Sequence, residues 1–509
     1  MRLLLLAALL AGAVPTPPPA AAAPAVAAAP PVAVAPSAGA TAAAPAPDRL
    51  AEVERHLREH HARTRAPGFA YAVVHRDRVV AQATWGVDGN GEPVTGATPF
   101  VLGSVAKSFT ALAVMQLVEA GRVELDAPAQ AYLPWFRLAD PAASARITVR
   151  HLLTHTSGIP DVAARGLTDR YDNSPDGLAR SVRDLAAVEP AGEPGESHRY
   201  SDANYMIAGA LVAAVSGRSF GAYLRTEVLD PLGMRGATTD AEADALGGLP
   251  AGHRYWFGRP WPFDTPFDTS GVPYGFLAAS LEDMTRYAAA HLGHGEKPVL
   301  SAKGFAELHT GQATMGPRGA YGLGWRDSVL SGADTRIVWH AGGTPDSFSH
   351  LLLIPGEELA VVVLANAYGV AMDGPLTSAA FNAARILLGA APVAEEEDPL
   401  LVWTRRGLLL VSGALLAALA WNVARAARRH PGRHALAATV AWVAGCAALA
   451  VAVGWGLPAA FEGARLRQVL LFAADIGHTI VAVIVLAAAT AVARLAGAAR
   501  TRRSPGPGR

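Results

Sequence analysis

The sequence contains a single cysteine, Cys446, which lies in an apolar stretch near the C-terminus. The chain before it therefore has no disulfide and no cysteine-based metal site, so a hydrophobic core must hold it together. Two histidine pairs stand at helical spacing, His56 with His60 and His151 with His155, but no set of carboxylates accompanies them. We expect these histidines to be solvated or to cap helices, and we predict no metal site.

An excess of charge of either sign is also missing, because 43 basic residues balance 43 acidic ones. Without a basic field, nucleic acid is not an expected partner. Lysine is scarce as well: Lys107, Lys297 and Lys303 are the only lysines, and arginine supplies the remaining positive charge. The two residue types differ in chemistry, because a buried lysine can lose its proton whereas an arginine keeps it. Lys107 therefore stands out, three residues after a serine.

The N-terminus has the pattern of a secretory signal. Arg2 precedes an apolar core from Leu3 to Val14, and Ala-x-Ala cleavage sites follow near residues 20–23. We predict a signal peptide at residues 1–23 and export of the domain that follows. Residues 24–47 are almost only alanine, proline and valine, a composition that builds no packed core and predicts a disordered linker.

Three apolar runs near the C-terminus are long enough to span a membrane: Gly407–Val423, Ala435–Leu457 and Val469–Ala493. We predict three transmembrane helices within 407–497, preceded by an acidic juxtamembrane linker at 392–406 and followed by a basic tail at 498–509. Arginines concentrate between the first two runs and in the tail, at Arg425, Arg428, Arg429, Arg433, Arg500, Arg502, Arg503 and Arg509. The positive-inside rule then predicts a multi-pass protein of the cell membrane, with an extracytoplasmic domain and a cytoplasmic C-terminus.

Two ionisable residues, Asp475 and His478, lie three apart within the third apolar run. Ionisable groups inside a membrane indicate function by default. A hydrogen bond that faces the helix bundle near the outer interface is the simpler explanation, and it is the one that we favour.

Residues 48–391 are predicted to form one soluble domain. Its expected elements are a helix at Leu50–Arg65 and strands at Phe69–His75, Val79–Trp85, Thr335–Val338, Phe348–Ile354 and Leu359–Leu364. The first two strands are expected to pair, and the last three are expected to be antiparallel. A long apolar run, Phe109–Val118, ends near Gly121 and predicts a helix that is buried on most sides.

Ser104 and Lys107 stand at the start of this buried helix. Residues three apart share a helix face, so the lysine side chain is expected beside the serine hydroxyl. Burial disfavours a charged amine, and a neutral lysine can take the serine proton, which makes the pair a candidate nucleophile and base. The alternative is that Ser104 only caps the helix and that Lys107 reaches the surface.

A second cluster, Tyr200-Ser201-Asp202, lies just before the apolar helical run Met206–Val215. A phenol at a junction between a loop and a helix can face a cleft. Tyr200, as a phenolate or sharing a proton with Lys107, can then serve as general base and later as acid. Taken alone, a tyrosine before a helix is more often a packing residue.

A third cluster, His340-Ala341-Gly342, follows a strand-like segment. The glycine lets a substrate backbone lie against the strand edge. His340 supplies a donor or a charge for a carboxylate or a developing oxyanion.

In content and order, these clusters resemble the serine β-lactamase-related family, which includes class C β-lactamases, D-alanyl-D-alanine carboxypeptidases and esterases. Ser104-x-x-Lys107 matches the first family motif, Tyr200-Ser201-Asp202 the Tyr-x-Asn position, and His340-Ala341-Gly342 the strand motif. His151–Asp161, Pro231–Met234 and Tyr321–Trp325 also look like family signatures.

The resemblance implies an α/β (α+β) fold, with a central antiparallel sheet flanked by helices, an all-helical region beside it and the site between them. It also implies that Ser104 is acylated while Lys107 and Tyr200 manage protons. The N–H of Ser104 and one N–H from the His340 segment would form the oxyanion hole. No metal or organic cofactor is needed. The partners expected from this are the membrane and a small-molecule or peptide substrate: a D-amino-acid peptide of the cell wall or a related amide or ester.

The sequence departs from the family pattern at two places. Asp202 stands where the family usually has asparagine, and Asp346-Ser347 where a glycine often follows the strand motif. An acid near Lys107 would oppose the lysine's role as base and would repel an anionic β-lactam. We therefore expect peptide or ester substrates in preference to penicillins. Activity as a β-lactamase or carboxylesterase of the same family is kept as an alternative to peptide hydrolysis.

Two alternatives come from other classes. Gly217-Arg218-Ser219-Phe220-Gly221 matches the G-x-S-x-G elbow of α/β-hydrolases, but a helical run precedes it instead of the required strand. The other alternative is a membrane-tethered penicillin-binding sensor without turnover, against which the intact Ser104, Lys107 and Tyr200 argue.

Overall fold

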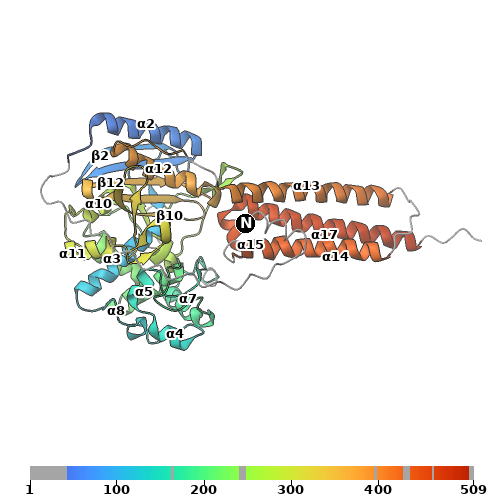
Figure 1. Cartoon of the computed structure of the whole chain (residues 1–509), viewed down its shortest axis with the longest axis horizontal. Helices are drawn as coiled ribbons and strands as arrows, with labels where there is room; N and C mark the ends of the chain where they lie inside the picture. Colours follow the sequence, from blue (N-terminus) through green and yellow to red (C-terminus); the bar gives the residue numbers. More distant parts are fainter. Residues whose placement is uncertain are drawn as a thin grey trace, which may run out of the picture. The chain divides into compact units, whose positions relative to one another are not determined.

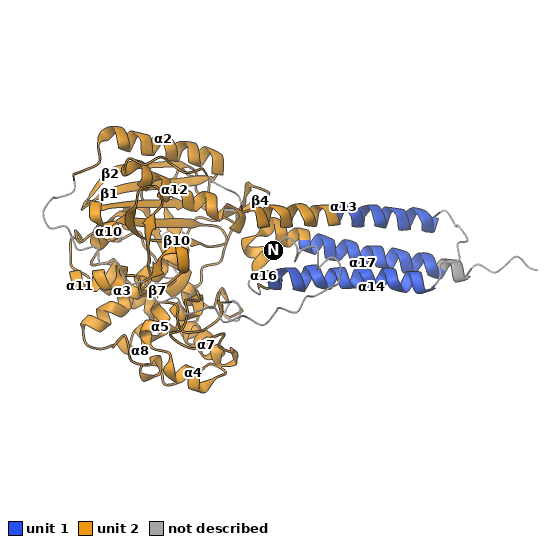
Figure 2. Ribbon diagram, viewed as in Figure 1, with its two compact units in different colours: residues 1–41, 412–460, 480–509 blue, residues 42–411, 461–479 orange. Residues whose placement is uncertain are grey.

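The computed structural model describes residues 43–161, 166–239, 248–394, 398–427, 436–460 and 464–503. They belong to two compact units (Figure 2): the larger is Ala42–Val411 with Phe461–Thr479, and the smaller includes Ser412–Ala460 and Ile480–Arg509. Several predicted features lie outside the described residues: the signal peptide, most of the linker at 24–47, residues 395–397, Arg428, Arg429, Arg433 and Arg509.

An eight-stranded antiparallel sheet forms the centre of the larger unit, in the order β2-β1-β12-β11-β10-β9-β8-β7 (Figure 1). Its strands are β1 (Gly68–His75), β2 (Arg78–Gly86), β7 (Ala313–Thr314), β8 (Ala320–Tyr321), β9 (Arg326–Leu330), β10 (Thr335–Gly343), β11 (Phe348–Ile354) and β12 (Leu359–Ala365). β1, β11 and β12 are buried along their whole length. Alternate side chains of these strands enter two different cores, which is why the strands have unbroken apolar sequences.

Helices cover both faces of this sheet. α2 (Pro47–Thr64) and α12 (Asp373–Leu387) share one core with Phe69 and Tyr71 of β1. α10 (Leu281–His291) and α3 (Ala106–Glu119) share the other core with Ala70 of β1. The sheet is therefore the middle of three layers, as the resemblance implies.

The all-helical region follows α3 in the chain and lies below the sheet in Figure 1. Its helices are α4 (Pro141–Arg146), α5 (Val149–Leu153), α7 (Gly177–Arg183), α8 (Asp202–Ser216) and α9 (Phe220–Leu224), with the short helical segments η2 (Ala129–Ala131), η3 (Asp184–Ala187) and η4 (Arg225–Leu229). Three further short segments are η1 (Gly103–Val105), directly before α3, and η6 (Thr269–Gly271) and η7 (Val272–Phe276), later in the chain. α3 and α8 are apolar on nearly every side and pack against each other in the core of this region.

The remaining elements of the larger unit are small. They are β3 (Pro99–Val101) paired with β6 (Ala278–Ser280), the three-stranded sheet of β13 (Ala367–Tyr368), β4 (Gly252–Trp256) and β5 (Arg259–Phe263), α11 (Ala302–His309), and the turns η8 (Gly316–Arg318), η9 (Pro355–Glu357) and η10 (Val370–Met372).

Three helical segments near the C-terminus are long and apolar enough to cross a membrane: Pro399–Ala427, Leu436–Ala460 and Ala474–Ala499. They contain α13 (Pro399–Ala427), α14 (Leu436–Val451), η11 (Ala452–Gly456), α15 (Leu457–Ala460) and most of α17 (Ala474–Arg503). The third segment begins later than Val469, where the hydropathy of the sequence placed its start. The chain breaks at Ala473, which separates the short helix α16 (Leu466–Phe472) from α17.

Asp475 makes an ion pair with Arg405, with 3.6 Å between Oδ2 and Nη1, and His478 contacts the carbonyl of Ala474 at 2.6 Å. Both contacts lie in the larger unit, at the ends of the spans. They match the structural explanation that we favour for these two residues.

The predicted helix at Leu50–Arg65 and the paired strands at the start of the domain are confirmed. The expectation of a solvated or capping histidine is wrong for His60, which is fully buried inside α2. His155 is also fully buried, but it follows the C-terminus of α5 in the left-handed conformation, and its N–H donates to the carbonyl of Leu152, so it does lie at a helix cap. His151 does complete the capping box of α5. The G-x-S-x-G segment joins two helices: Gly217 ends α8 in the left-handed conformation, and Ser219 caps α9. It is therefore no nucleophile elbow.

Candidate active site

The structure brings Ser104 and Lys107 together at the start of α3. Ser104 lies in η1 and is partly exposed, whereas Lys107 is completely buried. Lys107 Nζ lies 2.8 Å from Ser104 Oγ and 2.8 Å from the carbonyl oxygen of Tyr274. Ser104 does not cap the helix through its side chain, and Lys107 does not reach the surface. Both parts of the capping alternative therefore fail.

The backbone of β10 passes very close to Ser104, and glycine makes this possible. A Cβ at Gly342 would lie 2.4 Å from the Ser104 nitrogen and 2.2 Å from the Leu102 oxygen. Gly103 has a φ of 52°, and a Cβ there would lie 2.5 Å from the nitrogen of Gly343. Larger residues at these two positions would push the strand away from the serine.

The N–H groups of Ser104 and Gly343 are the candidate oxyanion donors. The turn between β10 and β11 is closed by a bond from Thr344 N to Ser347 O. Bonded and non-bonded pairs of residues alternate along an antiparallel ladder, so the pair Gly343–Phe348 is not hydrogen-bonded and the pair Gly342–Ser349 is. The N–H of Gly343 therefore points away from β11, towards Gly103. Two backbone donors thus meet beside the Ser104 hydroxyl.

Tyr200 lies over the same corner of the site. Its ring centroid is 5.0 Å from Lys107 Nζ, and its hydroxyl is hydrogen-bonded to Ser104. Burial, together with the nearby Asp202 carboxylate, raises the pKa of Tyr200 well above its usual value despite that hydrogen bond. The resting residue is therefore a phenol, and the phenolate form considered from the sequence is not the ground state.

Asp202 lies directly against the lysine. Its Oδ1 is 2.7 Å from Lys107 Nζ, in an ion pair between a buried amine and a carboxylate that is 29% exposed. Asp202 is the first residue of α8, and its backbone N–H donates to Asp161 at 3.3 Å. The Lys107 amine therefore has three partners: the Ser104 hydroxyl, the Tyr274 carbonyl and the Asp202 carboxylate.

His340 carries no charge in this site. It is buried, and burial together with the positive charges of Arg326 and Lys107 lowers its pKa well below the usual value. Its Nδ1 lies 2.7 Å from the carbonyl of Ala341, which only accepts, so Nδ1 carries the proton. Its Nε2 then accepts from the Tyr321 hydroxyl at 2.9 Å. Both nitrogens have partners within the protein, through which His340 positions Tyr321 and the strand. Its role towards a carboxylate or a developing oxyanion stays a prediction.

His155 is a support for Tyr200. Its ring centroid is 4.2 Å from that of Tyr200, and its Nδ1 accepts hydrogen bonds from the Ser201 backbone and the Asn204 amide. Burial and the charge of Lys107 lower the pKa of His155 well below its usual value, so it stays neutral. The bulk of a neutral ring fixes the loop that carries Tyr200 and Asp202.

Arg326 is a residue of the site that sequence reasoning missed. It opens β9, pairs with Trp339 of β10, and its guanidinium lies 5.8 Å from the Tyr200 ring and 5.1 Å from the Trp339 ring. Within the described ranges it forms no ion pair with a carboxylate. The only sequence signal is its place directly after the Tyr321–Trp325 signature.

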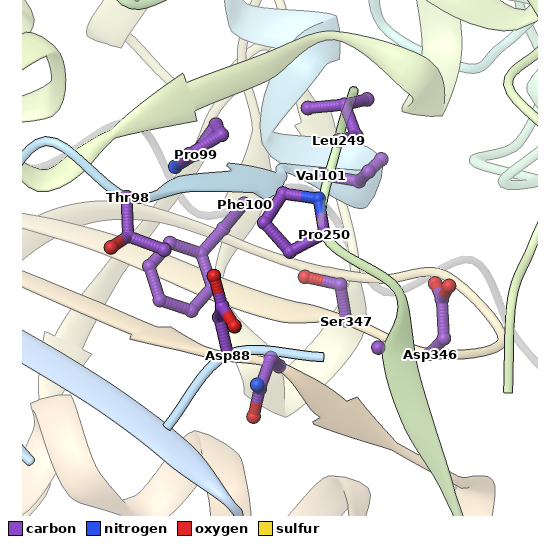
Figure 3. A pocket seen from close by; sticks show the side chains of 11 residues that line it. Asp88, Thr98, Pro99, Phe100, Val101, Leu249, Pro250, Asp346 and Ser347 are labelled. Carbon is purple, nitrogen blue, oxygen red and sulfur yellow. The ribbon is translucent and has the colours of Figure 1, made fainter. Parts of the chain in front are cut away.

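The second departure from the family pattern, Asp346-Ser347, lies away from Ser104. Figure 3 shows both residues beside a small cavity with Phe100 and Val101, and its volume of about 20 Å³ is enough for roughly one water molecule. Asp346 accepts hydrogen bonds from Thr344 and from the backbone of Thr265, and burial raises its pKa to about 6. It therefore joins the turn after β10 to the segment that contains Thr265.

A sheet covered by helices, with a serine and a lysine one turn apart beside the end of a strand, is typical of serine acyl-transfer hydrolases. Comparison with known proteins agrees: residues 53–384 match the family described as Beta-lactamase, and the chain belongs to that family. Its relatives include β-lactamases, penicillin-binding proteins and carboxypeptidases.

Among curated proteins, the chain is 32% identical over 322 residues to "Penicillin-binding protein 4" of Amycolatopsis lactamdurans, covering 60% of this chain and 82% of the relative. It is 26% identical over 325 residues to "Protein flp" of Staphylococcus aureus, covering 62% of this chain and 61% of that protein. The match therefore leaves more than a third of the staphylococcal protein uncovered.

Two solved structures share the fold. The octameric penicillin-binding protein homologue from Pyrococcus abyssi has a TM-score of 0.58 and 27% identity, covering 70% of this chain and 81% of that one. D-alanine carboxypeptidase AmpC from Burkholderia cenocepacia has a TM-score of 0.55 and 22% identity, covering 67% of this chain and 99% of that one.

Proposed function

We propose that the protein is a membrane-anchored, extracytoplasmic serine hydrolase that acts through an acyl-enzyme on Ser104 and cleaves D-amino-acid peptides with a free carboxylate. The observation that carries the proposal is the buried Lys107 amine 2.8 Å from the Ser104 hydroxyl, beneath the N–H groups of Ser104 and Gly343. This arrangement supplies a nucleophile, a proton acceptor and an oxyanion site.

Acylation begins when Ser104 Oγ attacks the substrate carbonyl and gives up its proton. Lys107 takes this proton in its neutral form, which the ion pair with Asp202 opposes, and the oxyanion lies between the two backbone donors. Tyr200, a phenol hydrogen-bonded to Ser104, donates a proton to the leaving amine and recovers it from Lys107. Water then cleaves the ester in the reverse sense, with the same groups in exchanged roles.

Asp202 is the basis of a prediction about substrate choice. We expect Asp202→Asn to raise the acylation rate by β-lactams severalfold, because the change removes both the ion pair and a charge that repels an anionic substrate. Acylation rates of the two proteins across a pH series measure this. The exposed Asp230→Asn is the matched control. Equal rates for the parent and Asp202→Asn, or efficient β-lactam turnover by the parent, would refute this role.

Arg326 supports the choice of a substrate that ends in a carboxylate. Its guanidinium faces the rings around the site and pairs with no acid in the described chain. A charge-assisted hydrogen bond contributes about 1.5–3 kcal/mol. We therefore expect Arg326→Gln to raise KM for a D-Ala-D-Ala peptide by about 10–100-fold.

The C-terminal amide of the same peptide is the control for Arg326, because it lacks the carboxylate. Its KM should hardly change in Arg326→Gln, and Arg326→Lys should restore part of the selectivity. An equal loss for acid and amide would mean that Arg326 only supports the rings.

A panel of D-Ala-D-Ala peptides, cephalosporins and short-chain esters separates the proposal from the β-lactamase and carboxylesterase alternatives. A penicillin-binding sensor would take up labelled penicillin at Ser104 and turn over none of the panel.

The orientation of the membrane helices belongs to the same proposal. By the positive-inside rule, the arginines after the first span and in the tail support an inside location for these segments and an outside location for the hydrolase domain. An alkaline phosphatase fusion after Arg509 should be inactive, and protease added to intact cells should reach the hydrolase domain. An active fusion with a protected domain would reverse the topology.

A further inference from the structure

The hairpin of β4 and β5 carries aromatic and cationic side chains on one of its faces. It turns tightly at Phe257 and Gly258, both of which have positive φ values. Cross-strand partners share a face, so Trp256 with Arg259 and Arg254 with Trp261 project to the same side.

The two faces of this hairpin differ in chemistry. Tyr255, on the opposite face, is buried in the sheet core and donates to the carbonyl of Thr64. On the outward face, Trp261 is 58% exposed, and Phe257 at the tip is 38% exposed. Tryptophans alternating with arginines make a surface that is apolar and cationic at once.

The same hairpin lies at the ends of the membrane spans. Phe257 and Gly258 line a cavity of about 150 Å³ with Leu401 and Arg405 of α13. The Trp256 ring is 4.7 Å from that of His478, near the start of α17. All of these residues belong to the larger unit, and Figure 2 shows β4 beside the start of α13.

The position of the uncharged run in α13 indicates how far these contacts lie from the hydrocarbon core of the membrane. A hydrocarbon core of about 30 Å takes about 20 helical residues, and the headgroup layer on each side adds about 5–8 Å. The uncharged run of α13 begins at Gly407, directly after Arg405 and Arg406. With the hydrocarbon core beginning at Gly407, Val402–Arg405 fall in the headgroup layer. The hairpin tip, which lines the same cavity as Val402 and Arg405, lies at this level.

We propose that the outward face of the β4–β5 hairpin binds the lipid surface into which the spans insert. Trp261 and Phe257 enter the interfacial layer, where tryptophan is favoured, and Arg254 and Arg259 meet lipid phosphates. The occupant is a phospholipid surface because the patch continues directly from the ends of the spans. This inference does not depend on the activity of Ser104.

The test uses the full chain in phospholipid nanodiscs containing phosphatidylglycerol. With Cys446→Ala as background, Trp261→Cys carries an environment-sensitive fluorophore, which is quenched by nitroxide lipids or by aqueous iodide. Val329→Cys, at a 63% exposed position on β9, is the matched control. We expect strong lipid quenching and weak iodide quenching at 261, and the reverse at 329.

A second labelled variant, Arg259→Cys, carries its label on the same face as Trp261, keeps this tryptophan and should also show lipid quenching. Adding Trp261→Glu to it should shift the quenching severalfold towards iodide, because the tryptophan anchor is lost. Iodide quenching at 261 equal to that at 329 would overturn the proposal, and so would protection from both quenchers, which would mean that protein covers the hairpin.

Discussion

Replacing Ser104 with alanine should abolish acylation and lower turnover by a factor of about 10⁴ or more, because its hydroxyl, 2.8 Å from Lys107 Nζ, is the proposed nucleophile. The fold should survive. Ser104 is partly exposed and caps no helix through its side chain, so we expect a change in the free energy of unfolding within about 0.5 kcal/mol. Labelling with a fluorophosphonate, together with thermal unfolding, measures both effects.

Ser219→Ala is the matched control for this experiment. That serine lies in the G-x-S-x-G segment and caps α9 on the surface. Its replacement should leave labelling unchanged. Turnover retained by Ser104→Ala, or lost in Ser219→Ala, would contradict the assignment of the nucleophile.

Lys107→Arg should be nearly as damaging as the loss of the serine, with turnover lowered by about 10³-fold or more. A guanidinium keeps its proton throughout the working pH range, so it cannot receive the proton of Ser104. It is also larger than the amine, in a fully buried space between Ser104 Oγ and the Tyr274 carbonyl. Overpacking of this kind typically costs about 1–3 kcal/mol.

Two further variants separate these effects. Lys107→Met keeps the length of the side chain without the proton acceptor, and it should also be inactive. Lys297→Arg makes the same chemical change at an exposed position and should have full activity. Activity of Lys107→Met within about tenfold of the parent would move the role of base to Tyr200.

The local part of the site was predictable from the sequence, because it depends on spacing along one helix. Ser104 and Lys107 meet because three residues make about one helical turn, from η1 into the first turn of α3, and α3 is buried because its side chains are apolar. The unbroken apolar stretches of β11 and β12 likewise predicted strands, and a central sheet requires both faces to be covered.

The parts that were missed depend on contacts between distant segments. Arg326 enters the site only through the register of β9 against β10, which places it opposite Trp339. His155 is buried because the loop before α8 folds over it, and its sequence spacing to His151 gave no sign of this. The break at Ala473 was not predicted either. Hydropathy cannot detect it, because Leu470–Phe472 are as apolar as the span that follows.

The charge of Asp202 was visible in the sequence, but its position was not. The structure puts its carboxylate 2.7 Å from the lysine, so the ion pair is a property of this chain that the family motif does not imply.

The most direct test of the central claim is to map the site of covalent attachment in the full chain. The protein is reacted with a fluorophosphonate, digested and analysed by mass spectrometry, with Ser104→Ala treated in parallel. We predict one adduct, on the peptide that contains Ser104, and none in the variant. An adduct on Ser219 or another residue, or unchanged labelling of Ser104→Ala, would contradict the claim that Ser104 is the nucleophile.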